Sequence, residues 1–233
     1  MKVLEVFCGT KSFSKECLKE WEVTTVDNNP KFEPDILVDV MQWDYTDFGP
    51  IDVLWMGVPC QFYSNASFKR DPEKANELAL RALEILDHFQ MLNPNLIWAI
   101  ENPYSSLLRQ QPFMRGFDYK VCDYCQYGTP SEGFGYKKRT VIFGNIDWNP
   151  RLCPGPGKCE NMQGSYHLET AQQGIQRKPP YPLQKRTHTR TQLYRMPPRL
   201  CRALVQAIHP GDVDHSEITD EASIGQQSAE GGR

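Results

Sequence analysis

The chain has 233 residues, 39% hydrophobic and 24% charged, with a formal net charge of -3. It contains no run near the roughly 18 apolar residues of a membrane span, and Met1 to Glu5 turns acidic too early for a secretory signal. Eight cysteines scattered over predicted helices and loops indicate reduced thiols rather than a disulfide framework. We therefore expect an intracellular monomer, cytoplasmic or nuclear, with one core and a small appended lobe.

Strands and helices alternate along the first half of the chain. Strands are predicted at residues 3–7, 22–26, 35–40, 51–57, 96–100 and 140–143, and helices at 14–20 and 72–92. In the second helix, Leu78, Ala82, Ile85, Leu86 and Phe89 recur at three- and four-residue spacings. Strands separated by helices imply an α/β fold with a mostly parallel sheet.

The first two strands end in residues suited to a nucleoside-bearing cofactor. Gly9 follows the first strand, and Asp27, which ends the second, could bind ribose hydroxyls. Asp39 could then meet an adenine edge. Lys11 and Ser12 replace the later glycines of a dinucleotide fingerprint, so a cofactor without phosphates, such as S-adenosylmethionine, is favoured.

Two later strands deliver a thiol and a carboxylate. Cys60 follows Pro59 in a loop after one apolar strand, and Glu101 ends the other. Ligands of open α/β sheets bind outside the carboxyl ends of the strands, so both side chains could share one cleft. Alternatively, Cys60 is a bystander thiol in a turn, Glu101 caps a loop, and Asn102-Pro103 only stops the strand.

The order of these motifs resembles the DNA cytosine-5 methyltransferase family, particularly its short phage and viral members. The resemblance extends over residues 1–209. It rests on Phe7-Cys8-Gly9, Asp27, Asp39, Pro59-Cys60-Gln61, Glu101-Asn102, the basic run 137–139 before a strand, and Gln192 to Leu200 near the end. It implies a class I methyltransferase-like Rossmann sheet with a small C-terminal recognition lobe.

The resemblance also implies roles for individual residues. Cys60 would add to carbon 6 of a flipped or single-stranded cytosine, Glu101 would act at N3, and Arg139 would hold the ring oxygen at position 2. The implied cofactor-binding residues are Phe7, Gly9, Thr10, Asp27, Asp39 and Pro59. The implied nucleic-acid contacts are Gln61, Ser64 and Lys137, with DNA, single- or double-stranded, as the partner.

Some features depart from the family pattern. Pro103 stands where valine usually follows Glu-Asn, Lys137 takes the first basic position of the arginine motif, and about 50 residues separate Arg139 from the last motif. That interval is short for a target-recognition region. An RNA cytosine-5 methyltransferase, an enzyme modifying free pyrimidine nucleotides at carbon 5, and an inactive nucleic-acid-binding relative are the alternatives.

The charge is unevenly divided near the end of the chain. No acidic residue occurs between Glu169 and Asp212, where the cations are Arg177, Lys178, Lys185, Arg186, Arg190, Arg195, Arg199 and Arg202. We expect Lys185, Arg186 and Arg190 to contact phosphates, the alternative being a solvated basic face. After Gly211, six acidic residues and one arginine form a tail predicted to be disordered.

The cysteines of the short lobe could hold a structural zinc ion. The set we favour is Cys125, Cys153, Cys159 and His167, although Cys122 could replace the histidine, and scattered reduced thiols are the alternative.

Taken together, the motifs divide the chain into four parts. These are a catalytic, cofactor-binding region (1–145), a target-recognition or zinc insert (146–191), a returning motif (192–210) and the tail (211–233).

Overall fold

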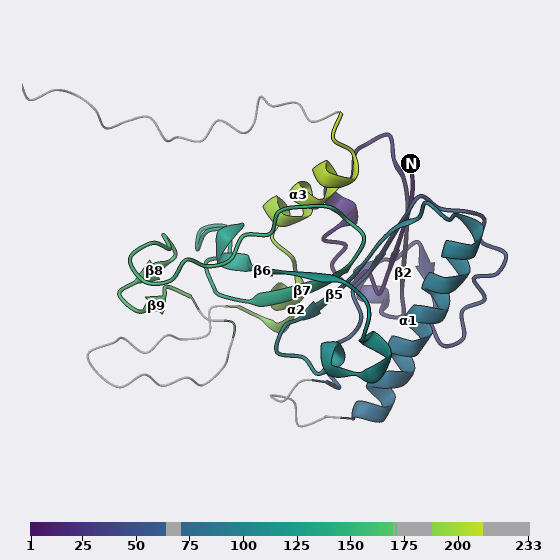
Figure 1. Ribbon diagram of the computed structural model, residues 1–233, viewed down its shortest axis with the longest axis horizontal. Helices are drawn as coiled ribbons and strands as arrows, with labels where there is room; N and C mark the ends of the chain where they lie inside the picture. Colours follow the sequence, from purple (N-terminus) through teal and green to yellow (C-terminus); the bar gives the residue numbers. More distant parts are fainter. Residues whose placement is uncertain (64–70, 170, 172–187, 212–233) are drawn as a thin grey trace, which may run out of the picture.

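The computed structural model describes residues 1–63, 71–169, 171 and 188–211 (Figure 1). Its strands are β1 (Lys2–Val6), β2 (Glu22–Asp27), β3 (Ile36–Leu37), β4 (Val53–Met56), β5 (Ile97–Pro103), β6 (Tyr119–Asp123), β7 (Arg139–Gly144), β8 (Met162–Gln163) and β9 (Tyr166–His167). Its α-helices are α1 (Pro72–Leu92), α2 (Arg190–Tyr194) and α3 (Pro198–Ile208). Short 3₁₀ helices are η1 (Ser14–Glu16), η2 (Pro30–Phe32), η3 (Leu108–Gln110), η4 (Pro112–Met114) and η5 (Tyr124–Gln126).

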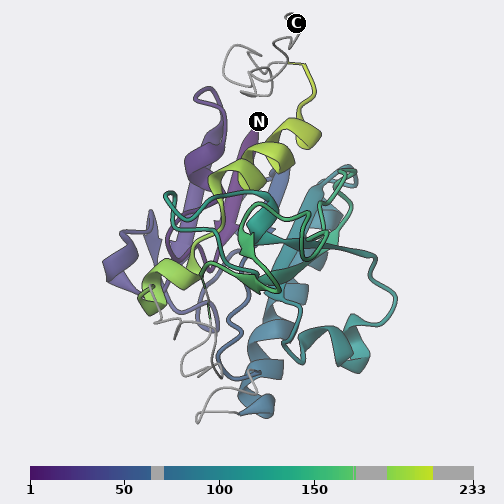
Figure 2. The same ribbon diagram turned by 90° about the vertical axis from the view of Figure 1, so that its left-hand side faces the viewer.

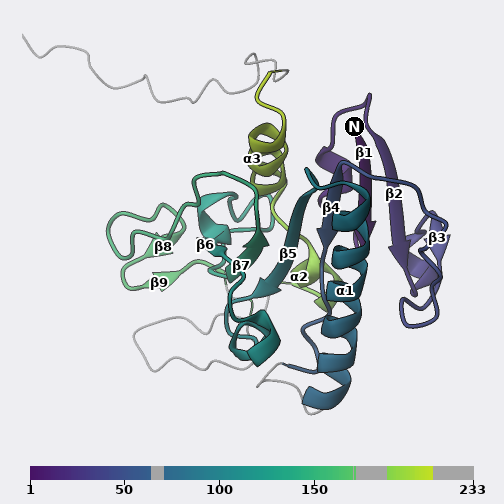
Figure 3. The same cartoon turned by 45° about the vertical axis from the view of Figure 1, so that its right-hand side comes forward.

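Seven strands form the main sheet, in the order β3-β2-β1-β4-β5-β7-β6 (Figure 3). The five strands from β3 to β5 are parallel, whereas β7 pairs antiparallel with both β5 and β6. The prediction of a mostly parallel, Rossmann-like α/β sheet is confirmed. The antiparallel edge strand β6 was not expected from the sequence.

The sheet carries a separate core on each face. Leu4, Leu54 and Ile100 point to one face, where α1 buries its apolar stripe, including Ile85 and Phe89. Their neighbours, among them Val3, Val53 and Ala99, point to the other face, which α3 covers. This alternation follows from the two-residue repeat of a strand, and it places the sheet between α1 and α3 (Figure 1).

Most predicted elements are confirmed, and two need correction. The long helix spans Pro72–Leu92 as expected, with Asp71 as its N-cap, whose side chain accepts a bond from the Lys74 amide. Residues 14–20 form only η1, because so short a segment gains too few hydrogen bonds to offset the cost of helix nucleation. Of the strand predicted at 35–40, only Ile36–Leu37 pair with β2.

The chain leaves the main sheet after β7, forms the antiparallel β8–β9 hairpin and later returns. Figure 1 shows this hairpin beyond β6, on the side away from α1. In the returning segment, the Met196 amide donates to Ser12 Oγ at 3.1 Å, and α3 packs against η1 (Figure 2). No helix in the described part of the chain is long and apolar enough to span a membrane.

Candidate active site

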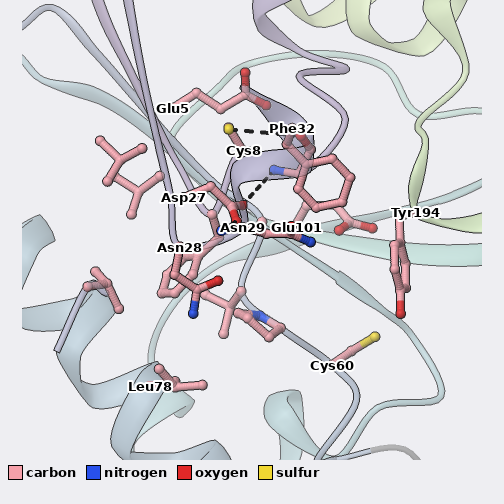
Figure 4. A pocket seen from close by; sticks show the side chains of 18 of the residues that line it. Glu5, Cys8, Asp27, Asn28, Asn29, Phe32, Cys60, Leu78, Glu101 and Tyr194 are labelled. Atoms are coloured by element: carbon pink, nitrogen blue, oxygen red, sulfur yellow. Dashed lines mark hydrogen bonds between the residues drawn. The ribbon is translucent and has the colours of Figure 1, made fainter. Parts of the chain in front are cut away.

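A pocket of about 550 Å³ opens at the carboxyl ends of the parallel strands. The segments that follow β1, β2, β3 and β4 line it, together with the end of β5, one side of α1 and the end of α2. In Figure 4, Asn28 and Leu78 lie on one side, and Cys60 and Tyr194 on the other. The sheet thus brings both predicted halves of the site into one cavity.

The cofactor half is organised by the turn after β1. Phe7 and Gly9 both have positive φ, 56° and 48°, which turns the backbone sharply at the strand end. Asp27 holds this turn, because one of its carboxylate oxygens accepts from the Gly9 amide at 2.9 Å and the other from the Asn29 amide at 2.8 Å. A carboxylate has further lone pairs, so Asp27 can still accept from a ligand hydroxyl.

The other residues predicted to bind the cofactor also reach the pocket. Thr10, Asp39 and Pro59 line it along with Phe7. The Thr10 hydroxyl lies 2.9 Å from that of Ser12, and Asp39 accepts from the Met41 amide at 3.0 Å. Apolar contacts are available from Phe32, Val38 and Leu78.

The reactive half is built from the ends of β4 and β5. Cys60 and Glu101 both line the pocket. Asn102, which is fully buried, donates from its side-chain amide to the backbone oxygen of Val58 at 2.8 Å. This bond fixes the Cys60 loop to the end of β5, where Glu101 stands.

Opposing charges act on the Cys60 thiol. Burial raises the pKa of Cys60, the positive charge of Lys138 lowers it, and the negative charge of Glu101 raises it. Tyr124 Oη donates to Glu101 Oε1 at 3.3 Å, which orients the carboxylate. A thiol needs its anionic form to attack, so the nearby cation matters for reactivity.

The structure does not bring Arg139 into the pocket. Its guanidinium makes two bonds to the buried carboxylate of Asp123, Nε–Oδ1 at 3.0 Å and NH2–Oδ2 at 2.9 Å. Burial acts to raise the pKa of Asp123, but the bonds from Arg139 and from the Cys153 amide outweigh it and hold that pKa below its usual range. Among the described residues, the basic side chains that line the pocket are those of Lys74 and Lys138.

The predicted nucleic-acid contacts are only partly described. Gln61 lines the pocket, whereas Lys137 is exposed and outside its lining. Ser64, Lys185, Arg186, the rest of residues 172–187, residue 170 and the tail from residue 212 lie outside the described residues. Arg190 begins α2, but its side chain is not described.

Three described cations of the acid-free segment make contacts within the chain. Arg199 pairs with Glu132 at 3.1 Å and Arg202 with Glu16 at 2.8 Å. Arg195 lies over the ring of Phe134 at 4.9 Å. Both ion-paired arginines are more than half exposed, so such pairs contribute little to stability and leave the phosphate prediction open.

Sequence reasoning missed Lys138, Tyr124 and the buried carboxylate of Glu5. Burial raises the pKa of Glu5 to about 7, and bonds involving Ser14 and Phe13 oppose that rise. Lys138 stands just before β7, and the two-residue repeat of a strand puts it on the same face as Thr140 without showing that Glu101 shares that face. Tyr124 and Glu5 left no comparable signal, because only packing decides which neighbours surround them.

The four predicted metal ligands lie together in the small lobe. One ligand atom each from Cys125, Cys153, Cys159 and His167 falls within 4.8 Å of all the others. His167 Nε2 is 3.5 Å from the sulfur of Cys153 and 3.8 Å from that of Cys159. Bonds of about 2.3 Å to sulfur and 2.0 Å to nitrogen put tetrahedral zinc ligands roughly 3.5 to 3.8 Å apart. Cys122, the alternative ligand, is instead buried in the core on the α3 side of the sheet.

Comparison with known proteins identifies the family. A frog virus 3 (isolate Goorha) protein named "Probable DNA (cytosine-5)-methyltransferase" is 33% identical to this chain, in an alignment that covers 70% of this chain and 79% of the viral protein. The chain belongs to the DNA (cytosine-5)-methyltransferase family. The resemblance inferred from its motifs is thereby confirmed, and its sheet is that of a Rossmann-like methyltransferase.

Other comparisons add little to this methyltransferase assignment. No family model matches the chain. Among solved structures, the Entamoeba histolytica methyltransferase EhMeth is similar over 65% of this chain, with 14% identity and a TM-score of 0.37. This chain spans 56% of EhMeth, and a similarity of that size does not bear on the assignment.

Proposed function

We propose that this methyltransferase transfers a methyl group from S-adenosylmethionine to carbon 5 of cytosine in DNA. The observation that carries the proposal is that the Cys60 loop and Glu101 meet in one pocket with the Gly9 turn and Asp27. A nucleophile, an acid and a nucleoside-binding turn are the groups that this reaction requires. Membership of the family and the name of the viral relative support DNA as the substrate.

The cofactor half fits S-adenosylmethionine better than a dinucleotide. The Gly9 turn leads only into the three-residue η1, so no α-helix N-terminus is available there for a pyrophosphate. Lys74 and Lys138 are the only cations that line the pocket among the described residues. We infer that Asp27 accepts from the ribose, that Asp39 faces the base, and that Phe7, Gly9, Thr10 and Pro59 complete the cradle.

The side chains account for the chemistry at the pyrimidine. The Cys60 thiolate forms a bond to carbon 6, which turns carbon 5 into an enamine carbon, and Glu101 supplies a proton or hydrogen bond to N3. The bound cofactor supplies an electrophilic methyl group. The demethylated thioether is the leaving group of the transfer. A water molecule then takes the proton from carbon 5, the electrons of that bond re-form the double bond between carbons 5 and 6, and the Cys60 thiolate is released. Neither face of a stacked base is open to sulfur, so the base must be flipped or unpaired.

Transfer of tritiated methyl from S-adenosylmethionine tests the proposal. We expect incorporation into duplex or single-stranded DNA, and DNA containing 5-fluorocytosine should trap a covalent adduct that Cys60→Ser cannot form. An adduct with Cys60→Ser would remove Cys60 as nucleophile. Incorporation only into tRNA would favour the RNA enzyme, and only into dCMP the nucleotide-modifying enzyme.

We also propose that Cys125, Cys153, Cys159 and His167 bind a structural zinc ion. The four ligand atoms lie within 4.8 Å of one another, and the distances from His167 Nε2 to the sulfurs of Cys153 and Cys159 already fall in the range of tetrahedral coordination. The β8–β9 hairpin has two residues in each strand, which is too little to form a core of its own. In this division of the chain, residues 1–145 bind the cofactor, 146–191 form the zinc-held insert, and 192–210 return to the sheet.

A further inference from the structure

The positive charge beside Cys60 and Glu101 comes from Lys138. Its ammonium nitrogen donates to the backbone oxygen of Leu193 at 3.2 Å and lies 3.5 Å from Tyr124 Oη. The same nitrogen is 4.7 Å from the centre of the Tyr124 ring, and that phenol bonds Glu101. These contacts hold the Lys138 side chain at the wall of the pocket, next to the reactive carboxylate.

Strand register explains why Lys138 rather than Arg139 takes this place. Glu101 of β5 stands opposite Ile142 of β7, so the even-numbered residues of β7 share its face. Thr140 and, by continuation, Lys138 therefore lie on the Glu101 side. Arg139 stands opposite Asp123 of β6 and shares the other face with it. A one-residue step along the strand exchanges the two faces.

Arg139 also forms an ion pair with the buried carboxylate of Asp123. The Asp123 side chain is fully buried, and it accepts two bonds from Arg139 and one from the Cys153 amide at 2.9 Å. Moving the guanidinium into the pocket would leave a buried carboxylate without its cation, which is strongly unfavourable. Lys74, the other cation of the pocket wall, lies over the ring of Phe62 at 5.1 Å.

We propose that Lys138 supplies the catalytic positive charge that the sequence motif assigns to Arg139, and that Arg139 instead holds Asp123 and the lobe that follows it. This inference rests on the proposed function. The ammonium favours the Cys60 thiolate in the free enzyme and is the donor available to an oxygen of the bound pyrimidine. As a point charge it lacks the two-pronged geometry of arginine.

The test uses the pH dependence of Cys60 alkylation by iodoacetamide, followed by mass spectrometry of the peptide that contains Cys60. The charged groups acting on this thiol are Lys138 and Glu101; the phenol of Tyr194 lines the same pocket, and that of Tyr124 contacts Glu101 and Lys138. Lys138→Met should move the midpoint upward by about one pH unit, and Lys138→Arg should restore it. Glu101→Gln should move it downward. Arg139→Met should leave the midpoint in place but lower the thermal melting temperature.

Methyl transfer provides the second readout. Lys138→Met should lose about tenfold or more in transfer rate, with Lys138→Arg recovering most of it. An unchanged alkylation midpoint in Lys138→Met, or a shifted one in Arg139→Met, would overturn the inference. If the wild-type enzyme transfers methyl to none of the substrates tested, the proposed function fails, while the alkylation midpoints still decide the role of Lys138.

Discussion

Asn102 and Val58 connect the two strands that carry the reactive groups. The side-chain amide of Asn102 donates to the Val58 backbone oxygen at 2.8 Å, with the asparagine fully buried. Since Cys60 stands two residues after Val58 and Glu101 immediately before Asn102, this one bond sets the thiol loop relative to the carboxylate. The asparagine of the Glu-Asn motif thus has a positioning role.

Removing this bond should disorganise the site more than the fold. Asn102→Ala leaves the Val58 oxygen without its donor, which we expect to cost about 1–3 kcal/mol in free energy of unfolding. The rate of methyl transfer should fall while affinity for S-adenosylmethionine is kept. Asn102→Asp is the matched variant, since it keeps the shape but loses the donor. Normal transfer rates in both variants would contradict the positioning role.

Asp27 should matter for cofactor binding because its carboxylate shapes the turn and faces the pocket. We expect Asp27→Asn to weaken S-adenosylmethionine binding about tenfold, as for the loss of one hydrogen bond to a charged group. Isothermal titration calorimetry measures the change. Asp52→Asn is the control, because Asp52 accepts from the Lys2 amide at the amino ends of the parallel strands, on the side of the sheet opposite the pocket. Unchanged affinity in Asp27→Asn would remove Asp27 from the site.

Glu5 should make the protein less stable as the pH rises. Its pKa is 4.5 in an ordinary setting and about 7 in the folded chain, chiefly because of burial. Its contribution is therefore fully present below pH 4.5 and is lost as the pH rises to about 7, with a total loss of about 3 kcal/mol.

Glu5→Gln isolates this contribution, since glutamine can still accept from the Ser14 amide but does not ionise. Urea unfolding of both proteins from pH 4 to 8 gives the difference in free energy of unfolding. The variant should gain stability relative to wild type as the pH rises. Parallel pH profiles for the two proteins would show that Glu5 does not titrate in this range.

Metal analysis tests the zinc site. Protein purified without chelators should contain about one zinc ion per chain, and Cys153→Ser should lose it. Cys122→Ser is the matched control, because Cys122 is a buried thiol outside the cluster and its loss should reduce stability but not metal content. Chelation should unfold the segment that contains the β8–β9 hairpin, residues 146–169, before the main sheet. Wild-type protein without stoichiometric metal would show that packing alone holds the lobe.

Local patterns in the sequence were sufficient for the long helix and most strands. The three- and four-residue spacing of apolar residues predicts Pro72–Leu92 because that spacing places them on one helix face. Ordered motifs predicted the cavity that contains Gly9, Asp27, Cys60 and Glu101, because parallel strands deliver their carboxyl ends to one edge.

Tertiary structure decided what these patterns leave open. The sequence presents Lys137, Lys138 and Arg139 as equivalent cations, and only the pairing of β7 with β5 and β6 turns Lys138 toward Glu101 and Arg139 toward Asp123. Likewise, Cys122 and Cys125 are three residues apart, but the end of β6 between them sends one thiol into the core and the other to the cluster with Cys153, Cys159 and His167. Register and packing depend on partners distant in the chain, so no local pattern determines them.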